Sequence, residues 1–557
     1  MSLCKRRGFI WPSFELYGGV AGMYDYGPLG CALRNNIVDV WRSIYKGREG
    51  FVEIDSETVG PREIFKASGH VDEFADLITY CKECQAPFRA DHMVKEFYDN
   101  PDVLTPKQLE EAFVKHNIRC LECGGELGPV EEFNLMFKTT IGPGSARVGY
   151  LRPETAQGIF VNFPNLYRYN REKLPLGVIQ TGRSYRNEIA PRQGMIRMRE
   201  FNQMEVELFV DPEDKDWARF PDIAGEYIDL LPNTGDETIR ITVGEAVEKG
   251  IIANKVLAYF VYTTKQLLTR LGIDPARLRF RQHLQDEMAH YAADCWDAEV
   301  LLSYGWTEIT GIADRGCWDL SRHAEFSGTE LKHFKRFDEP REVTVTKIKA
   351  KHKLLGPAFK TKAKAIAAAM ESMSPSDVKD GHLTVDIDGE KVDVSDEFFE
   401  VAEVTEKVTG ERVVPHVIEP SHGLDRIFYS VLEHAFSYDA EKDYTVMHLV
   451  PEVAPIKVGV FPLMEKDGLD TLAMSIYEKI HTHRVEAYYD GSGTIGKRYA
   501  RMDEVGTPWC ITVDYDSLED GTVTIRDRDT TEQKRIKIDD AARIVGELLE
   551  GKDFASI

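Results

Sequence analysis

Two neighbouring stretches of the chain alternate between apolar and polar positions in the manner of β-strands. They span residues 178–186 and 197–209, and the segment between them contains Pro191 and Gly194, which are typical of a turn. In the second stretch the odd positions are polar or aromatic (Arg199, Phe201, Gln203, Glu205, Glu207) and the even positions are mostly apolar (Met198, Met204, Val206, Leu208). The pattern predicts a hairpin with one unusually polar face.

Other periodic segments predict the remaining architecture. Apolar residues at helical spacing predict helices over 32–45, 102–116, 253–271, 287–303 and 427–436, with strands over 51–54 and 305–316. In the last hundred residues, strands over 456–461, 485–489 and 509–513 alternate with helices over 469–480 and 495–504, and two more strand runs precede a helix over 541–549. This alternation predicts a mostly parallel sheet.

Composition indicates an ordinary globular protein. The 557 residues are 43% hydrophobic and 29% charged, which suits three or four domains at roughly 150 residues each. The formal net charge of -24 argues against indiscriminate nucleic-acid binding, so any RNA contact must be local. No apolar run has the length of a signal peptide or a membrane span. We therefore expect a cytoplasmic protein without a membrane partner.

Four of the nine cysteines form two tight pairs, Cys81/Cys84 and Cys120/Cys123. Four thiolates satisfy tetrahedral zinc, and each two-residue spacer lets one turn hold the ion twice. Because all four ligands would be protein atoms, the site would be structural. The alternative is a set of unpaired buried thiols.

The most basic part of this acidic chain runs from Lys332 to about Met373, and an acidic stretch, Asp386 to Asp396, follows it. Such lysine runs often form a solvated helix face. We favour an inserted module that contacts RNA, because phosphate neutralisation needs a local cluster of positive charge.

The polar hairpin suits a nucleoside triphosphate, because guanidinium groups bind phosphates and a ring can stack on a base. The bland alternative is a hairpin with a solvated charged face. The run Arg186-Asn-Glu188, a loop, then Arg199-Glu-Phe201 resembles motif 2 of the class II aminoacyl-tRNA synthetases. The resemblance implies that Arg186 holds the α-phosphate, Glu188 meets the adenine edge and Phe201 stacks on the ring.

Two further segments resemble the other motifs of that class. The helix over 32–45, the strand over 51–54 and Pro61 resemble motif 1, which builds a dimer interface in the family, although a helix packed within its own domain would show the same pattern. The run Glu419-Pro-Ser-His-Gly-Leu-Asp-Arg426 opens the helix over 427–436 and resembles motif 3, whose arginine clamps the triphosphate.

These runs, together with Arg152-Pro-Glu-Thr-Ala-Gln-Gly158 and Phe201-Asn-Gln-Met-Glu205, are similar to glycyl-tRNA synthetases of the homodimeric, archaeal and eukaryotic type. The resemblance implies an α+β class II synthetase core, an antiparallel sheet with helices, that carries insertions and is followed by a C-terminal α/β anticodon-binding domain. The expected parts are a core over 1–324 and 411–450, a zinc-binding insertion over 81–123 within it, a lysine-rich insertion over 325–410 and an anticodon-binding domain over 451–557.

The resemblance also implies the site residues. The catalytic ones are Arg186, Glu308 and Arg426. The ATP-binding ones are Arg186, Asn187, Glu188, Ile196, Arg197, Met198, Arg199, Glu200, Phe201, Glu308, Ile309, Gly423, Leu424, Asp425 and Arg426. The glycine-binding ones are Arg89, Glu154, Phe201, Asn202, Gln203, Met204, Glu205, Arg315, Glu419, Pro420, Ser421, His422 and Gly423.

Two of these residues have simpler interpretations when taken alone. Glu154 could merely favour a helix amino terminus, and Arg315 could form a structural ion pair. Glu308, if buried, needs a partner, and Mg²⁺ on a triphosphate would supply one.

The implied reaction joins glycine to its tRNA through glycyl-adenylate, with ATP and Mg²⁺ and no covalent enzyme intermediate. One alternative is an RNA-binding paralogue that has lost the chemistry. The other is a P-loop ATPase, since Gly491-Ser-Gly-Thr-Ile-Gly-Lys497 follows a strand and opens a helix. Arg498 speaks against that loop, because it stands where a hydroxyl should bind magnesium.

Overall fold

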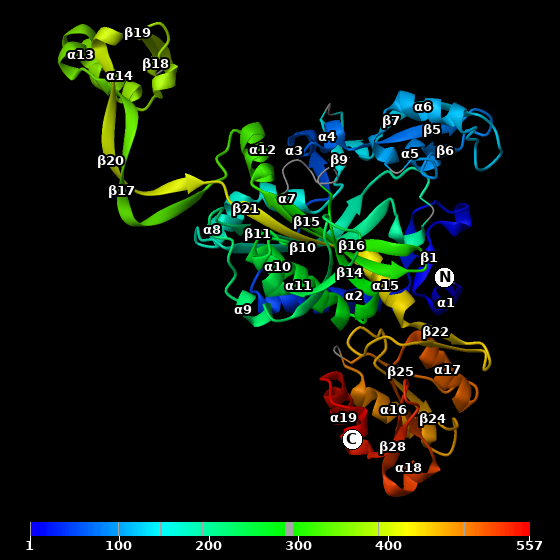
Figure 1. Cartoon of the computed structure of the whole chain (residues 1–557). Helices are drawn as coiled ribbons and strands as arrows, with labels where there is room; N and C mark the ends of the chain where they lie inside the picture. The colour runs from blue at the N-terminus through cyan, green and yellow to red at the C-terminus, as the bar shows by residue number, and fades with distance from the viewer. Residues whose placement is uncertain are drawn as a thin grey trace. The chain divides into compact units, whose positions relative to one another are not determined.

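The computed structural model describes residues 2–98, 100–144, 147–191, 193–284, 293–387, 389–482 and 485–557, without the side chain at 102. The chain divides into two compact units (Figure 1). The first comprises the residues up to Leu331 together with Val414–Ile557, and the second is Lys332–Val413. Each unit is described separately below.

A nine-stranded sheet forms the centre of the first unit. Its order is β13-β12-β14-β15-β16-β21-β11-β10-β3, and all neighbours are antiparallel except β10/β3 and β12/β14. This sheet with its helices confirms the predicted α+β core. The strands are β3 (Val52–Glu53), β10 (Leu176–Tyr185), β11 (Glu200–Val210), β12 (Tyr227–Leu231), β13 (Ile239–Thr242), β14 (Leu278–Gln282), β15 (Asp294–Leu302), β16 (Gly305–Gly316) and β21 (His416–Gly423).

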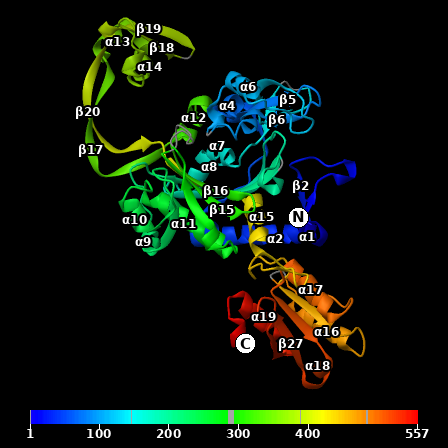
Figure 2. The same ribbon diagram turned by 45° about the vertical axis from the view of Figure 1, so that its right-hand side comes forward.

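Helices cover both faces of this sheet (Figure 2). The even positions of β11, such as Met204 and Val206, share a core with α2 (Pro28–Arg42), α11 (Lys255–Arg270) and α15 (Leu424–Ala435). Phe209, at an odd position, instead packs with α7 (Ala156–Val161). Because side chains alternate along a strand, the polar odd positions of β11 all face the α7 side.

The helix predicted over 287–303 is wrong where it can be compared with the structure. Residues 294–302 form β15, while 285–292 lie outside the described residues. Trp296, Ala298 and Val300 are fully buried at every second position, between β14 and β16. The period of two was present in the sequence, but a short apolar run does not distinguish strand from helix until its sheet neighbours are known.

The insertion that carries the cysteine pairs has its own small sheet, in the order β6-β5-β7. Its elements are β5 (Ala75–Cys81), β6 (Pro87–Arg89), β7 (Leu127–Asn134) and α6 (Pro106–Lys115). Thr105 caps α6 through its side chain, so the helix is shorter than the predicted 102–116. Phe88, Leu109 and Phe113 form a separate core beneath the helix.

The second unit is a long antiparallel ribbon that ends in a small helical module (Figure 1). The ribbon pairs β17 (His333–Ala350) with β20 (Phe399–Val413). The module contains α13 (His352–Phe359), α14 (Ala363–Glu371) and the hairpin of β18 (His382–Ile387) and β19 (Glu390–Ser395), which share a core. Lys353, Lys360 and Lys364 are exposed.

The C-terminal part is a five-stranded sheet in the order β25-β24-β26-β27-β28 with helices around it. The predicted helices are confirmed, but only β25, β24 and β26 are parallel, whereas β27 and β28 are antiparallel. The connection from β26 to β27 is too short for a parallel crossover. The elements are β24 (Val458–Pro462), α16 (Leu469–Ile480), β25 (Ala487–Tyr489), α17 (Ile495–Val505), β26 (Trp509–Val513), α18 (Tyr515–Asp520), β27 (Thr522–Asp527), β28 (Gln533–Lys537) and α19 (Ala541–Leu549).

None of the helices in the described ranges has both the length and the apolar character that crossing a membrane requires.

Candidate active site

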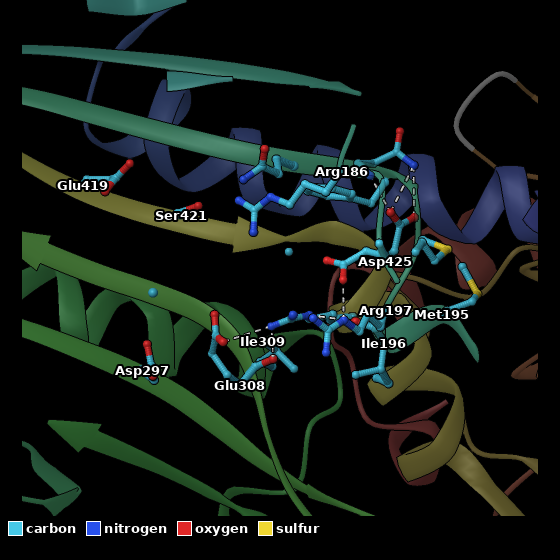
Figure 3. A pocket seen from close by; sticks show the side chains of 18 of the residues that line it. Arg186, Met195, Ile196, Arg197, Asp297, Glu308, Ile309, Glu419, Ser421 and Asp425 are labelled. Atoms are coloured by element: carbon cyan, nitrogen blue, oxygen red, sulfur yellow. Dashed lines mark hydrogen bonds and ion pairs between the residues drawn. The ribbon is translucent and has the colours of Figure 1, made fainter. Parts of the chain in front are cut away.

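A cavity of about 270 Å³ lies on the face of the central sheet that bears the polar side of β11 (Figure 3). Fifteen of the predicted site residues line it, and they come from β11, β16, β21, the start of α15 and the loop before β11. These are Arg186, Glu188, Ile196, Arg197, Met198, Phe201, Asn202, Gln203, Glu308, Ile309, Glu419, Ser421, Gly423, Asp425 and Arg426.

Arg186 contacts two aromatic rings. Its Cζ lies 5.3 Å from the ring centroid of Phe201 and 5.4 Å from that of Phe74, and its Nε donates to the carbonyl of Pro153 at 3.2 Å. Cation–π contacts with both rings, together with the hydrogen bond, restrict the rotamers of the Arg186 side chain. The side chain is therefore positioned before any ligand binds.

Arg426, in the first turn of α15, reaches the other side of the cavity. It donates to the carbonyl of Ile196 at 3.1 Å and forms a 3.1 Å ion pair with Glu308 (Figure 3). Burial alone would raise the pKa of Glu308, but Arg426 and Arg186 outweigh it and lower that pKa. The Glu308 side chain is half exposed, and its ion-pair partner in this structure is Arg426.

Two further carboxylates, Glu188 and Asp425, accept hydrogen bonds at the loop before β11 and at the start of β11. Glu188 accepts a hydrogen bond from Arg197 Nε at 2.6 Å. Asp425 is buried and accepts from the Asn202 backbone N–H at 2.5 Å and from the hydroxyl of Tyr26. The bond to Asp425 connects β11 to the amino terminus of α15, and the bond to Glu188 lies within the loop.

The opposite end of the cavity is acidic, with Glu419 and Ser421 side by side on β21 (Figure 3). Arg315 binds Glu419 with Nη1, at 2.8 and 3.0 Å from its two oxygens, and binds Asp319 on α12 (Trp318–Ser327) with Nε and Nη2. Arg315 is thus a buried ion-pair residue that orients Glu419. It does not line the cavity.

Glu154 and Glu205 lie behind this acidic end. Gln157 donates to Glu154 at 2.8 Å and to Asp319 at 3.3 Å, which joins Glu154 to the Arg315 network. Burial favours the neutral acid, but His70 and Arg315 outweigh it and hold the pKa of Glu154 well below its usual range.

Glu205 is 1% exposed and accepts a hydrogen bond from Thr155 Oγ1 at 2.8 Å. Burial and the neighbouring Glu419 raise the pKa of Glu205 to about 8. Oxygen atoms of Glu205, Glu207 and Glu419 lie within 4.8 Å of one another. Glu205 and Glu207 do not line the cavity themselves, but they lie beside Glu419, which does. The carboxyl groups gathered at and behind this end suit a small cation such as an ammonium group.

Glu207 is a member of this cluster that the sequence did not identify as a site residue. It is fully buried, and neither carboxylate oxygen has a hydrogen-bond partner among the described residues. Burial, followed by Glu419, raises the pKa of Glu207 well above its usual range. The signal was its place two residues after Glu205, on the same face of a strand.

Several predicted residues lie elsewhere. Met204, Pro420 and His422 point from their strands into the helix-side core, where His422 packs edge-on against Trp41 and Tyr45. Asn187, Leu424, Arg199, Glu200 and Arg89 also do not line the cavity.

The last three of these residues have identified partners. Arg199 donates to the carbonyls of Ala21 and Glu188, Glu200 pairs with Arg183, and Arg89 pairs with Asp91 and Asp76.

The cavity also has lining residues that the sequence did not indicate. His283, Cys295 and Asp297 cluster on one wall, with His283 Nε2 2.8 Å from Asp297 Oδ2. The helix predicted over 287–303 concealed the strand pattern in which Cys295 and Asp297 alternate with buried Trp296, and nothing in the sequence singled out His283. Met195, Gly311 and Ala313 complete the set.

The four paired cysteines come together as predicted. Cys81 Sγ lies 3.4 Å from Cys123 Sγ, and Cys84 Sγ lies 3.6 Å from Cys120 Sγ, with no disulfide among them. Tetrahedral zinc with Zn–S bonds of about 2.3 Å separates its sulfur atoms by about 3.8 Å. Backbone N–H groups also point at Cys81 and Cys120. The geometry and chemistry of the four sulfur atoms therefore fit zinc.

The carbonyl groups of the glycine-rich loop before α17 bind the side chain of Arg498. Arg498 is buried and donates to the carbonyls of Gly491 at 2.6 Å and Gly493 at 2.8 Å, and also to that of Pro462. Carbonyl oxygens around a guanidinium group make a cation-binding loop, the reverse of a phosphate cradle.

Comparison with known families agrees with this geometry. The chain matches the tRNA synthetase class II core domain (G, H, P, S and T) over residues 145–435 and the anticodon binding domain over residues 457–548. In a fold search it resembles the Giardia lamblia prolyl-tRNA synthetase in complex with prolyl-adenylate, with a TM-score of 0.53 at 14% identity, covering 99% of this chain and 77% of that one. The fold and the site define a class II aminoacyl-tRNA synthetase.

Sequence relatives narrow the class. The chain is 51% identical to the glycine–tRNA ligase of Methanothrix thermoacetophila, covering 99% of this chain and 96% of that one. It is 50% identical to that of Methanocaldococcus jannaschii, covering 99% and 98%, and 50% identical to that of Archaeoglobus fulgidus, covering 99% and 97%. The chain belongs to the glycine–tRNA ligase family.

Proposed function

We propose that this chain activates glycine with ATP and transfers it to the glycine tRNA. The observation that carries the proposal is a single cavity with Arg186 and Arg426 at one end and Glu419 at the other, where buried Glu205 lies beside Glu419. The first end suits a triphosphate and the second suits an ammonium group. Membership of the glycine–tRNA ligase family supports the same pairing of substrates.

The reaction needs positioning and charge neutralisation more than a nucleophilic side chain. The glycine carboxylate attacks the α-phosphorus, pyrophosphate leaves, and the terminal ribose hydroxyl of the tRNA then attacks the activated carbonyl. Arg186 would stabilise charge on the α-phosphate and Arg426 would bind the distal phosphates. Mg²⁺, which the half-exposed Glu308 fits as a ligand, would neutralise further phosphate charge when bound.

Glycine offers no side chain to recognise, so its ammonium group must be held instead. Glu205 and Glu419 would bind it, with Glu154 adding negative charge from behind. Ser421 on β21 would occupy the space that a side-chain methyl group needs. Exclusion of larger amino acids by steric blockage requires no editing site.

Exchange of labelled pyrophosphate into ATP, with each standard amino acid in turn, tests the proposal. We expect exchange with glycine alone. Absence of exchange with any amino acid in folded, metal-loaded protein would favour the non-catalytic RNA-binding paralogue. Hydrolysis of ATP without an amino acid would favour the ATPase.

We further propose the boundaries of the parts: a core over 1–324 and 411–450, the zinc-binding insertion over 81–123, the lysine-rich insertion over 325–410 and an anticodon-reading domain over 451–557. We propose that exposed lysines of the lysine-rich module, such as Lys353 and Lys364, contact the tRNA. The location would be cytoplasmic, where tRNA is charged.

A homodimer formed through the motif 1 region also belongs to the proposal. Its support is the resemblance of α2 and β3 to that motif; within one chain, Leu33, Ile37 and Trp41 of α2 are already buried in the core. Sedimentation that shows only monomer at micromolar concentration would contradict the dimer.

The KM for glycine is expected to depend on pH through Glu205. Its carboxyl, with a pKa raised to about 8 by burial and Glu419, is mostly neutral below that pH and cannot attract an ammonium group. The KM should therefore fall by about tenfold per unit as the pH rises toward 8 and then level off. Exchange kinetics at pH 6.5 to 8.5 measure the KM for glycine. A KM that does not change over this range would contradict the role of Glu205 in binding glycine.

Removing one cysteine ligand is expected to release the metal and loosen the insertion. Cys120→Ser should abolish stoichiometric zinc, and amide hydrogen exchange in β5 to β7 should accelerate by at least about 10²-fold, because zinc-binding energy is folding energy in such small modules. Cys4→Ser, at a half-buried cysteine outside the cluster, should keep both the zinc and the slow exchange. Full zinc content in Cys120→Ser would refute the site.

A further inference from the structure

The small sheet of the cysteine insertion contacts the nucleotide-side arginines at the end opposite its cysteines. Strand β5 ends at the thiol ligand Cys81, and its other end begins next to Phe74 and carries Asp76. The ring of Phe74 lies under Arg186, at 5.4 Å. One strand therefore joins the metal-binding cysteines to the cavity.

A second contact comes from the end of β7, which pairs with the start of β5 through Ala75 and Asn134. The carbonyl of Leu135 accepts a hydrogen bond from the backbone N–H of Asn187, the residue after Arg186, at 2.8 Å. Leu135 in turn donates its own N–H to the carbonyl of Phe74 at 3.0 Å. The root of the insertion sheet thus fixes both the backbone and the side chain at Arg186.

The third contact is ionic. Asp76 Oδ2 lies 3.2 Å from Arg89 Nη1 on the neighbouring strand β6 and 3.7 Å from Arg197 Nη2 in the loop that lines the cavity. Arg197 is also bound to Glu188 at 2.6 Å. The row Arg89, Asp76, Arg197, Glu188 alternates in charge. The Asp76 side chain is only 16% exposed, so solvent screens these charges weakly.

We infer that the cysteine-clamped insertion positions the nucleotide-binding arginines, and that Asp76 is the positioning residue through which it holds Arg197. This inference rests on the proposed function, because it requires ATP at that end of the cavity. The cysteine insertion would then act in the reaction through its sheet. The cysteines fix one end of the sheet, and the other end positions the guanidinium groups of Arg186 and Arg197.

Asp76 can be changed without removing the sheet that carries it. The core of the insertion consists of apolar residues such as Phe88 and Leu109, and the Asp76 carboxylate is not part of it. Asp76→Asn keeps the shape and removes the charge. The effect should therefore appear in ATP binding and not in the fold of the insertion.

The test compares Asp76→Asn with Glu110→Gln in glycine-dependent pyrophosphate exchange. Loss of the weakly screened pair at Arg197 is expected to raise the KM for ATP about tenfold. The KM for glycine should change less than about twofold, because the carboxyl cluster lies at the other end of the cavity. Glu110 accepts a backbone N–H from Val130 within the same insertion; its variant is the matched control and should leave both constants unchanged.

A double-mutant cycle tests whether Asp76 affects ATP binding through Arg197. If Asp76 acts through Arg197, Asp76→Asn adds nothing to the KM for ATP in an Arg197→Gln background. Chelation of the metal should weaken equilibrium binding of ATP, measured by calorimetry without turnover, and should leave glycine binding unchanged. If Asp76→Asn does not fold by circular dichroism, Phe74→Leu replaces it, since that variant removes the ring under Arg186 and keeps an apolar side chain.

The outcomes separate this inference from the proposed function. A wild-type chain that shows no glycine-dependent exchange would overturn the proposed function itself. An active wild type whose Asp76→Asn variant has an unchanged KM for ATP, or equal rises in both KM values, would overturn only the positioning role.

Discussion

Replacement of Arg186 with lysine is expected to lower the kcat of glycine-dependent pyrophosphate exchange by about 10²- to 10³-fold, the usual cost of losing one preorganised donor to developing charge. The positive charge remains in this variant, but the planar guanidinium group does not. Only the planar group can stack on the rings of Phe74 and Phe201 and also present paired donors to a phosphate. Steady-state exchange at saturating glycine and ATP measures the loss.

Arg183→Lys provides the control, since Arg183 lies three residues earlier, pairs with Glu200 and does not line the cavity. Its kcat should stay within about twofold of wild type, as is usual for exposed ion pairs. Near wild-type exchange in Arg186→Lys would mean that charge alone suffices at this position, and the assigned role of Arg186 in the reaction would have to be abandoned.

Glu205→Gln is expected to raise the KM for glycine by about 10²-fold or more, the range seen when one partner of a buried charge pair is truncated. Glutamine keeps the shape and can still accept from Thr155, but it cannot acquire the negative charge that an ammonium group needs. The KM for ATP should change little. The fall in glycine KM toward pH 8 should also disappear, because the group that ionises has been removed.

A second buried carboxylate tests whether the effect is specific. Glu49 has a side chain that is 2% exposed, pairs with Arg48 and accepts from the Tyr259 hydroxyl, but it does not belong to the cluster of Glu205, Glu207 and Glu419. Glu49→Gln should lower stability without changing the KM for glycine. If both variants raise the KM equally, the cause is general loosening of the fold, and Glu205 leaves the proposed glycine site.

Arg186 lines one end of the cavity and Glu205 lies beside Glu419 at the other, so the effects of the two variants should be separable. Arg186→Lys acts mainly on kcat and Glu205→Gln mainly on the KM for glycine. Additive effects on kcat/KM in the double variant would agree with two sites that do not share a partner.

Much of the fold and the site could be predicted from the sequence alone. The hairpin over 178–209 is local, because its alternation and its turn residues are encoded in adjacent positions. The cysteine pairs and the helices of the C-terminal part are of the same kind, and each agrees with the structure. Local motifs of this kind also contain Arg186, Glu188, Glu419 and Arg426, which line the cavity.

The tertiary structure decided the rest, because it depends on which strands are neighbours. Residues 294–302 form a strand only because β14 and β16 flank them, and this placed Asp297 and His283 at the cavity. The run Glu419–Gly423 was predicted as one binding segment, but alternation on β21 turns His422 into the opposite core.

Burial and pairing also depend on residues that are distant in the sequence. Arg315 could be read as a substrate contact until Asp319 and Glu419 were seen to bind it. Glu207 became notable only when it proved to be fully buried beside two other carboxyl groups. The sequence by itself determined which chemical groups the site contains, and the packing of the sheet determined which of them face the cavity, because that depends on register and burial between strands far apart in the chain.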